Sequence, residues 1–103
     1  MASKGTAALQ AMIEDATVDA YGDDEQLTVL FTMIEEHLAV PFPTTVLGVE
    51  VTVRKIDLTA DTIVAICTRG HHRQRIDLLD LPIPTPPPDG AAWIDAYRHW
   101  AGR

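Results

Sequence analysis

Cysteine is almost absent from this sequence, since Cys67 is the only one among 103 residues. A single cysteine excludes a disulfide within the chain and excludes a zinc site built from several thiolates. Because Cys67 lies in the apolar run TIVAIC, we expect a small buried side chain rather than a reactive thiol.

Long apolar runs are also missing. No run approaches the roughly 20 residues that a membrane-spanning helix requires. The N-terminal sequence MASKGTAALQAMIED has too weak and too interrupted an apolar stretch for a secretory signal. We therefore expect a cytoplasmic protein that does not associate with membranes. A length of 103 residues, with 47% hydrophobic and 22% charged residues, predicts one globular domain over residues 1–103.

The motifs that identify common enzyme classes are missing as well. The chain contains no G-x-S-x-G, no glycine loop that cradles phosphate and no H-E-x-x-H. Acidic pairs such as Asp77 and Asp80 could act as general acid and base, but nothing in the sequence indicates the pocket that such chemistry needs. The sequence therefore favours a binding protein over an enzyme.

Basic residues are missing from one half of the chain, because no Lys or Arg occurs between residues 5 and 53. Residues 1–53 contain one lysine and nine acidic residues, a net charge of −8. Residues 54–103 contain seven Lys or Arg and six Asp, a net charge of +1, so the formal charge of −7 comes from the first half. Such a surface repels nucleic acid and anionic lipid, and it favours metal cations or basic protein partners.

Two helices are predicted in the first half. Apolar residues recur every three or four positions over residues 6–20, which predicts an amphipathic helix that Gly22 ends. A second helix is predicted from Asp23 to just before Pro41, because Asp23 followed by Gln26 fits a capping box. Its apolar stripe consists of Leu27, Leu30, Phe31, Ile34 and Leu38.

The periodicity then changes to that of strands. Val49, Val51 and Val53 alternate with polar residues, and 62–69 and 73–81 are rich in Ile, Val and Leu. The linker RGHHR predicts a hairpin turn in which a glycine adopts a positive φ. We therefore predict an α+β fold, with two N-terminal helices, a small antiparallel barrel-like (SH3-like) or curled sheet covered by the second helix, and a C-terminal helix.

A proline-rich segment precedes that last helix. LPIPTPPPDG (81–90) predicts a stiff connector, because its prolines lack the backbone N–H and hold their predecessors extended. Asp89 is the predicted N-cap of the final helix. Trp93, Tyr97 and Trp100 then recur at helical spacing, which predicts that the helix packs against the core by an aromatic stripe.

The acidic residues of the first half do not all have a structural explanation. Carboxylates in the first turn of a helix gain about 0.3–1 kcal/mol from its dipole, which accounts for the segment 23–25. Asp19 is predicted in the last turn of the first helix, and Glu35 and Glu36 in the last turn of the second, where the dipole disfavours them by a similar amount. Arginines folded over from the second half, bound cations or solvent must compensate their charge.

A bound divalent cation would convert this repulsion into attraction. Oxygen ligands in a loose arrangement suit calcium, which accepts six to eight oxygens in flexible geometry. The segment is not an EF-hand, because DAYGDDEQ lacks the ligand spacing of that loop. The predicted ligands are Asp19, Asp23, Asp24, Glu25, Glu35 and Glu36. The alternative is a non-enzymatic interaction module whose acidic face binds a basic protein partner without metal.

The chain also resembles a known family. The residues that carry the resemblance are Val18 to Tyr21, Glu25, Gln26, Glu35, Glu36, Leu38, Pro41, Phe42, Tyr97 and Trp100, in the segments VDAYGDDEQ, IEEHLAVPF and DAYRHW. Their order and spacing are similar to those of the small acidic calcium-binding proteins first described in cyanobacteria, the CcbP-like family. The resemblance implies calcium held by surface carboxylates.

The segment TRGHHRQR (68–75) is a short basic patch. Its adjacent histidines, His71 and His72, point in different directions in an extended turn, so we do not expect them to share a metal. The patch has no aromatic residue on which a base could stack, so we do not expect nucleic acid to bind there. The sequence therefore favours a solvated hairpin tip.

Overall fold

The computed structural model describes residues 5–102, which form three helices and a four-stranded antiparallel sheet. The elements are α1 (Thr6–Ala16), α2 (Asp23–His37), β1 (Phe42–Val46), β2 (Val49–Leu58), β3 (Ile63–Arg69), β4 (His72–Asp77) and α3 (Ala91–Trp100). The α+β class, with two N-terminal helices and one C-terminal helix, is confirmed.

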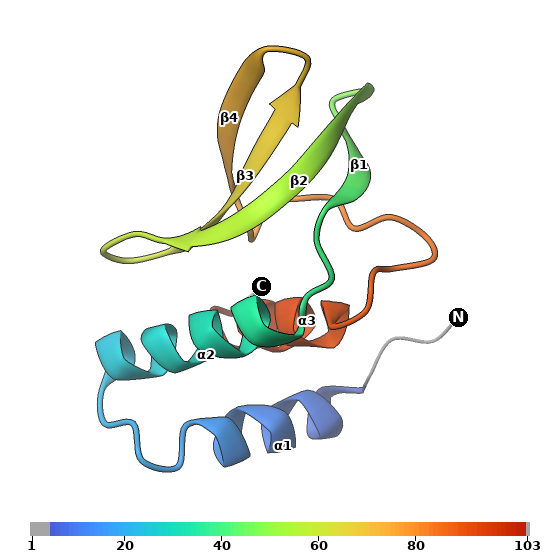
Figure 1. Cartoon of the computed structure of the whole chain (residues 1–103). Coiled ribbons are helices and arrows are strands. Elements are labelled where there is room, and N and C mark those ends of the chain that lie inside the picture. The colour runs from blue at the N-terminus through green and yellow to red at the C-terminus, as the bar shows by residue number, and fades with distance from the viewer. Residues whose placement is uncertain (1–4, 103) are drawn as a thin grey trace.

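The elements are stacked in layers (Figure 1). The sheet has the strand order β1-β2-β3-β4 and lies on one side of α2 and α3, while α1 packs on the other side of these two helices. The sheet is open rather than closed into a barrel, because β1 and β4 do not pair with each other. The edge of β1 instead contacts the proline-rich connector, where the buried Thr44 hydroxyl donates to the carbonyl oxygen of Pro82 at 2.6 Å.

The core lies between the sheet and the middle layer of helices. Leu30 and Ile34 of α2, Val53 of β2, Ile63 of β3 and Ile94 of α3 are completely buried. Fully burying an aliphatic side chain of this size stabilises the fold by about 1.5–3 kcal/mol relative to leaving it exposed. The apolar stripe predicted for the second helix therefore packs against the predicted strands in one core.

Cys67 is a core residue, as its apolar surroundings in the sequence predict. It faces the helices from β3 and is 1% exposed. Burial raises the pKa of its thiol, because the thiolate would lose its hydration. Cys67 is therefore held as a neutral side chain.

Polar contacts link the C-terminal helix to the sheet, whereas Trp93 and Trp100 of its aromatic stripe contact His37 and Gln26 of α2. The Tyr97 hydroxyl is 3.0 Å from the Thr62 hydroxyl and accepts from the backbone N–H of Ile63 at 3.3 Å. Arg98 donates to the carbonyl oxygens of Leu78 and Leu81, which close the turn after β4. Burial lowers the pKa of Arg98, an effect that the nearby carboxylates of Asp95 and Asp80 oppose.

Both predicted helix caps are wrong. The N-caps are Gly22 and Gly90, and neither Asp23 nor Asp89 makes a side-chain capping bond. Gln26, the predicted partner of Asp23 in the capping box, instead accepts a hydrogen bond from Trp100 Nε1 at 2.8 Å. Each N-cap position has a positive φ, 89° at Gly22 and 86° at Gly90, which an L side chain rarely adopts.

Gly90 also has a packing role that a side chain would prevent. A Cβ atom at this position would overlap the carbonyl group of His37, the last residue of α2. The neighbouring Asp89 uses its carbonyl oxygen, not its carboxylate, to accept from the backbone N–H of Ala39 at 2.8 Å. The end of the connector therefore packs closely against the end of α2. This close contact explains why the N-cap residue of α3 is a glycine.

The first helix is shorter than its apolar spacing predicts. It ends at Ala16 instead of continuing to residue 20, and Gly22 does not end it. The Thr17 backbone N–H and hydroxyl both donate to the carbonyl oxygen of Ile13, at 2.9 and 2.6 Å. Residues 17–19 form a turn, so Asp19 lies outside α1, and the argument from the helix dipole does not apply to it.

The strands follow the predicted alternation, with one irregularity. β2 is longer than predicted and contains a bulge between Val53 and Lys55, where the register against β3 shifts. β3 and β4 form the predicted hairpin, and Gly70 in its turn has a φ of 57°. β1 was not predicted as a separate strand; its Pro43 is tolerated because β1 is an edge strand.

Candidate functional site

The six predicted ligands lie at the two ends of α2, and all six are exposed. Asp23, Asp24 and Glu25 form the first helical turn of α2, and Asp19 lies in the chain reversal before it. Glu35 and Glu36 belong to the last helical turn of α2. Asp24 and Glu35 are eleven positions apart, which corresponds to about 16 Å along a helix axis. A single ion therefore cannot contact both groups.

Three of the six carboxylates border one hollow beside the start of α2. This acidic hollow has a volume of about 450 Å³ and is lined by Ala16, Val18, Asp19, Ala20, Asp24, Glu25, Thr28 and Val29. It is formed by the end of α1, the connection between the helices, and the first two turns of α2. Asp19 and Asp24 come from different elements, so the hollow is a feature of the fold rather than of one helix.

The local sequence explains how the connection brings these residues together. Thr17 stops α1 early, and Gly22, with φ 89° and ψ 160°, adopts a backbone conformation available almost only to glycine. The chain can therefore reverse within six residues and place Asp19 beside the first turn of α2. The Thr28 hydroxyl donates to the carbonyl oxygen of Asp24 at 3.0 Å, so it is satisfied locally.

The carboxylates border the hollow without converging on one point. Within residues 5–102, no three side chains of His, Cys, Asp or Glu lie close enough together to hold a metal ion. Contact with one ion would therefore require the exposed side chains of Asp19, Asp24 and Glu25 to rotate toward it.

The other end of α2 has a different environment. Glu35 lines a smaller hollow of about 170 Å³ together with Lys55 and Asp57 of β2. The sheet therefore does bring one cation, Lys55, next to this end of the helix. Arg54, Arg73 and Arg75, which could also have folded over, lie on the sheet instead.

Apolar side chains are exposed next to the acidic hollow. Val18 is 71% exposed and lines it, and Tyr21, which is 77% exposed, lies in the same connection. Isolated exposed apolar residues are common, but two beside a hollow bordered by carboxylates form a mixed surface. Periodicity could not reveal these residues, because the sequence predicted that Val18 belonged to a helix.

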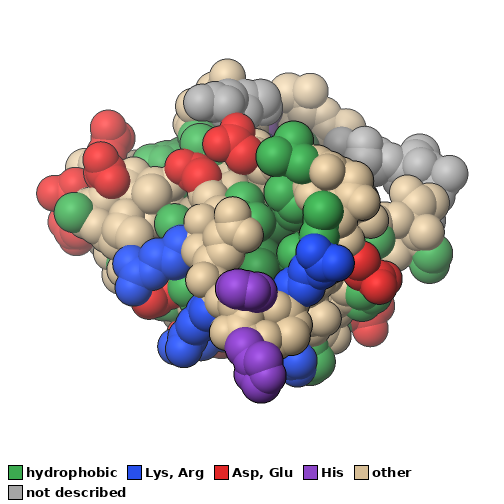
Figure 2. Space-filling view, turned by 90° about the horizontal axis from the view of Figure 1, so that it is seen from above, with side chains coloured by type: hydrophobic (Ala, Val, Ile, Leu, Met, Phe, Trp, Pro, Cys, Tyr) green, Lys and Arg blue, Asp and Glu red, His purple; other side chains and the backbone are tan. Residues whose placement is uncertain are grey.

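The outer face of the sheet, away from the helices, is basic. Arg54 of β2 lies on this face together with Arg73 and Arg75 of β4, and a view from above shows Lys, Arg and His side chains gathered over the sheet (Figure 2). The sequence revealed only the part contributed by the hairpin, whose histidines are exposed as predicted. Adding the residues of β2 requires the strand register, which the sequence alone does not provide.

Comparison with known proteins yields no relative for this chain. No model of a protein family matches it, and neither a curated protein nor a solved structure is significantly similar. The resemblance to the CcbP-like family therefore remains a prediction carried by the residues quoted above. Within the part of the chain that the structure describes, no helix combines the length and the apolar character needed to cross a membrane.

Proposed function

We propose that this protein is a non-enzymatic, cytoplasmic calcium-binding protein, and that the acidic hollow is its binding site. The observation that supports the proposal is the placement of Asp19, Asp24 and Glu25 around one hollow. No Lys or Arg occurs between residues 5 and 53 to compensate their charge. Calcium is the ion of choice because it prefers carboxylate oxygens and tolerates irregular geometry.

The proposed site is weak. Its three carboxylates are exposed and must rotate to contact one ion, which costs side-chain entropy. Affinity for calcium rises with the charge and rigidity of the site, so we expect a dissociation constant on the order of 10⁻⁵ M or weaker. Asp23, which does not line the hollow, contributes charge nearby, whereas Glu35 and Glu36 are too distant to contact the same ion.

Calorimetric titration of metal-free protein with calcium, repeated with magnesium, tests the proposal. In a buffer of about 0.1 M ionic strength, diffuse contacts between surface charges are largely screened. We expect saturable calcium binding with much weaker magnesium binding, because magnesium demands near-octahedral geometry. Absence of saturable calcium binding at millimolar concentrations would refute the proposal.

A pair of variants separates a local site from a diffuse negative charge. Asp24→Asn removes a carboxylate from the hollow, and Glu36→Gln removes one from the other end of the same helix. Both change the net charge by the same amount. We expect Asp24→Asn to weaken calcium binding about tenfold and Glu36→Gln to change it less than twofold, since only a direct ligand is lost in the first. Equal effects would show that no local site exists.

The second candidate is an interaction module that binds a basic protein segment. The exposed side chains of Val18 and Tyr21 favour it, because they add apolar contact area beside the carboxylates. Substituting Val18 by Ser distinguishes the two functions. It leaves every carboxylate in place, so calcium binding should persist, whereas binding of a basic peptide with an apolar side chain should weaken.

A further inference from the structure

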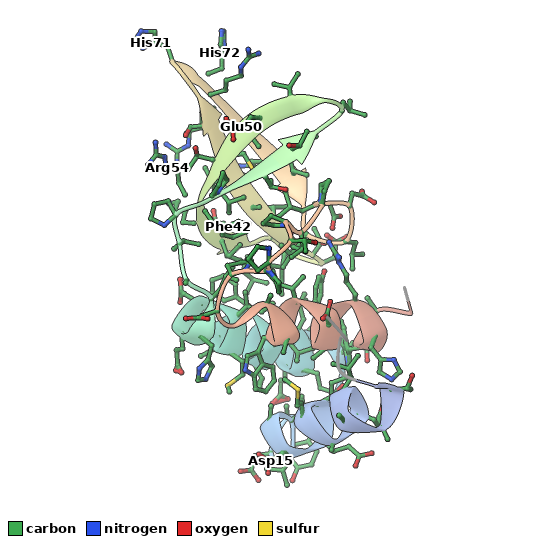
Figure 3. The ribbon with its side chains drawn as sticks, turned by 90° about the vertical axis from the view of Figure 1, so that its right-hand side faces the viewer. Asp15, Phe42, Glu50, Arg54, His71 and His72 are labelled. Carbon is green, nitrogen blue, oxygen red and sulfur yellow. The ribbon has the colours of Figure 1, made fainter. Side chains whose placement is uncertain are left out.

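The outer face of the sheet contains another hollow, which the proposed function does not use. It has a volume of about 450 Å³ and is lined by Glu50, Thr52, Arg54, Thr68, Arg69 and Gly70. We call it the basic hollow, because it contains two arginines and one carboxylate. Figure 3 shows Arg54 and Glu50 in the sheet and Asp15, on α1, at the opposite end of the molecule.

The bulge in β2 explains how Arg54 reaches this hollow. Thr52 pairs with Thr68 and Lys55 with Ile66, so the backbone between them contains one residue more on β2 than on β3. Such a bulge redirects side chains, and it allows two consecutive residues to lie on the same face. Arg54 and Lys55 are both exposed while the flanking Val53 and Ile56 are buried in the core, so neither cation enters the core.

Arg54 is also held in place. Its Nε–H donates to the Thr68 hydroxyl oxygen at 3.0 Å, across the strand pair. That bond directs the Nε–H toward Thr68 and leaves the terminal N–H groups available. The Thr68 hydroxyl accepts from Arg54, so its own O–H also remains a donor. Arg69, the next residue of β3, also lines the hollow. A guanidinium with free N–H groups next to a hydroxyl donor can bind phosphate oxygens.

We propose that the basic hollow binds the phosphate group of a small phosphorylated molecule, with Arg54 and Thr68 as donors. The volume of the hollow lies within the range of about 300–1,000 Å³ that is typical of small-molecule sites, so it has room for the group that carries the phosphate.

All six aromatic residues lie on helices, in the connection between α1 and α2, or at the buried start of β1, so none offers a stacking surface at the basic hollow. This disfavours single-stranded nucleic acid as the ligand.

Glu50 provides an internal test, because it lines the same hollow with the opposite charge. Its carboxylate opposes a bound phosphate, so replacing it should improve binding, whereas replacing a donor should weaken it. A diffuse attraction of anions to the basic face gives a different pattern, in which every cation of the face contributes equally. Arg75 is the matched control, since it is exposed on β4 and does not line the hollow.

Nuclear magnetic resonance titration of the calcium-free protein measures this directly. The probes are inorganic phosphate and glycerol 3-phosphate, each added to ¹⁵N-labelled protein in a buffer without phosphate. We expect saturable shifts in the amides of residues 50–54 and 68–70, with tighter binding of glycerol 3-phosphate. Shifts spread evenly over the sheet, or shifts that do not saturate, would overturn the proposal.

The variants sharpen the same titration. We expect Arg54→Gln to weaken binding about tenfold, Thr68→Val about threefold to tenfold, and Glu50→Gln to tighten it about threefold. Arg75→Gln should change it less than twofold. If Arg54→Gln and Arg75→Gln weaken binding equally, no discrete phosphate site exists. The spectrum of each variant shows whether it is folded, and calcium binding by Arg54→Gln should remain unchanged, which separates this proposal from the first.

Discussion

The helical layers and the sheet share one core but differ in surface charge. The segment from residue 5 to residue 41, which contains α1 and α2, has eight acidic residues and no Lys or Arg. The sheet segment from β2 to β4 has five of the chain's eight Lys and Arg residues and four acidic residues, a net charge of +1. Because the core is built from buried apolar side chains of both, the fold does not depend on these charges. The acidic hollow and the basic hollow therefore lie in layers of different charge.

The largest effect should come from breaking the core that joins the layers. Leu30 of α2 is completely buried between them, so Leu30→Ala should reduce the free energy of unfolding by about 2–5 kcal/mol. Urea denaturation followed by circular dichroism measures the loss. Thr32→Ala, an exposed position on the same helix, is the control and should change stability by no more than about 0.5 kcal/mol. A loss below about 1 kcal/mol for Leu30→Ala would contradict a shared core.

A smaller loss should follow from removing the polar link between α3 and the sheet. Tyr97→Phe deletes the hydroxyl that contacts Thr62 and the backbone N–H of Ile63, and it leaves that N–H buried without a partner. We expect the free energy of unfolding to fall by about 1–3 kcal/mol. Tyr21→Phe removes the same atom from a side chain that is 77% exposed, so thermal unfolding of this variant should match the parent.

The two ends of α2 should respond with opposite signs. Asp23→Asn removes an anion from the first turn and should lower stability by about 0.3–1 kcal/mol, whereas Glu36→Gln removes one from the last turn and should raise it by a similar amount. The measurement is chemical denaturation of metal-free protein at low salt. High salt should shrink both changes. Two changes of the same sign would show that net charge, not position on the helix, determines the effect.

The smallest effect concerns Cys67, which lies in the sheet but faces the helices. Burial raises the pKa of its thiol, whereas the thiol of the unfolded chain ionises near a pH of about 8.5. The unfolded state therefore loses its proton first, and stability falls as the pH rises from about 8.5 toward the folded pKa. The free energy of unfolding of Cys67→Ala should decrease more gradually with pH than that of the parent protein over this range. At neutral pH the variant is less stable than the parent. Identical pH profiles would indicate an accessible thiol.

The sequence predicted the elements that depend on periodicity and missed those that depend on long-range contacts. The stripe from Leu27 to Leu38 and the alternation in β2 identified a helix, a strand and the faces they bury. The caps were wrong because Gly90 is determined by its approach to His37, and Gln26 by its bond to Trp100, both distant in sequence.

The candidate sites show the same division. Clustering of acidic residues in the sequence located the start of α2, and the separation of Asp24 from Glu35 follows from the continuous helix that the apolar stripe predicts. The basic hollow was missed because Arg54 and Thr68 are fourteen residues apart and meet only through the register of β2 and β3. Pairwise contacts between strands cannot be read from local patterns.

The most direct test of the account is the location of calcium binding. A calcium titration of ¹⁵N-labelled, metal-free protein reports every backbone amide separately. We predict saturable shifts in residues 18–29, which surround the acidic hollow, and little change at residues 35 and 36 or on the sheet. Equal shifts at both ends of α2, or no saturable shift, would contradict a local calcium site and leave these carboxylates as a solvated acidic surface.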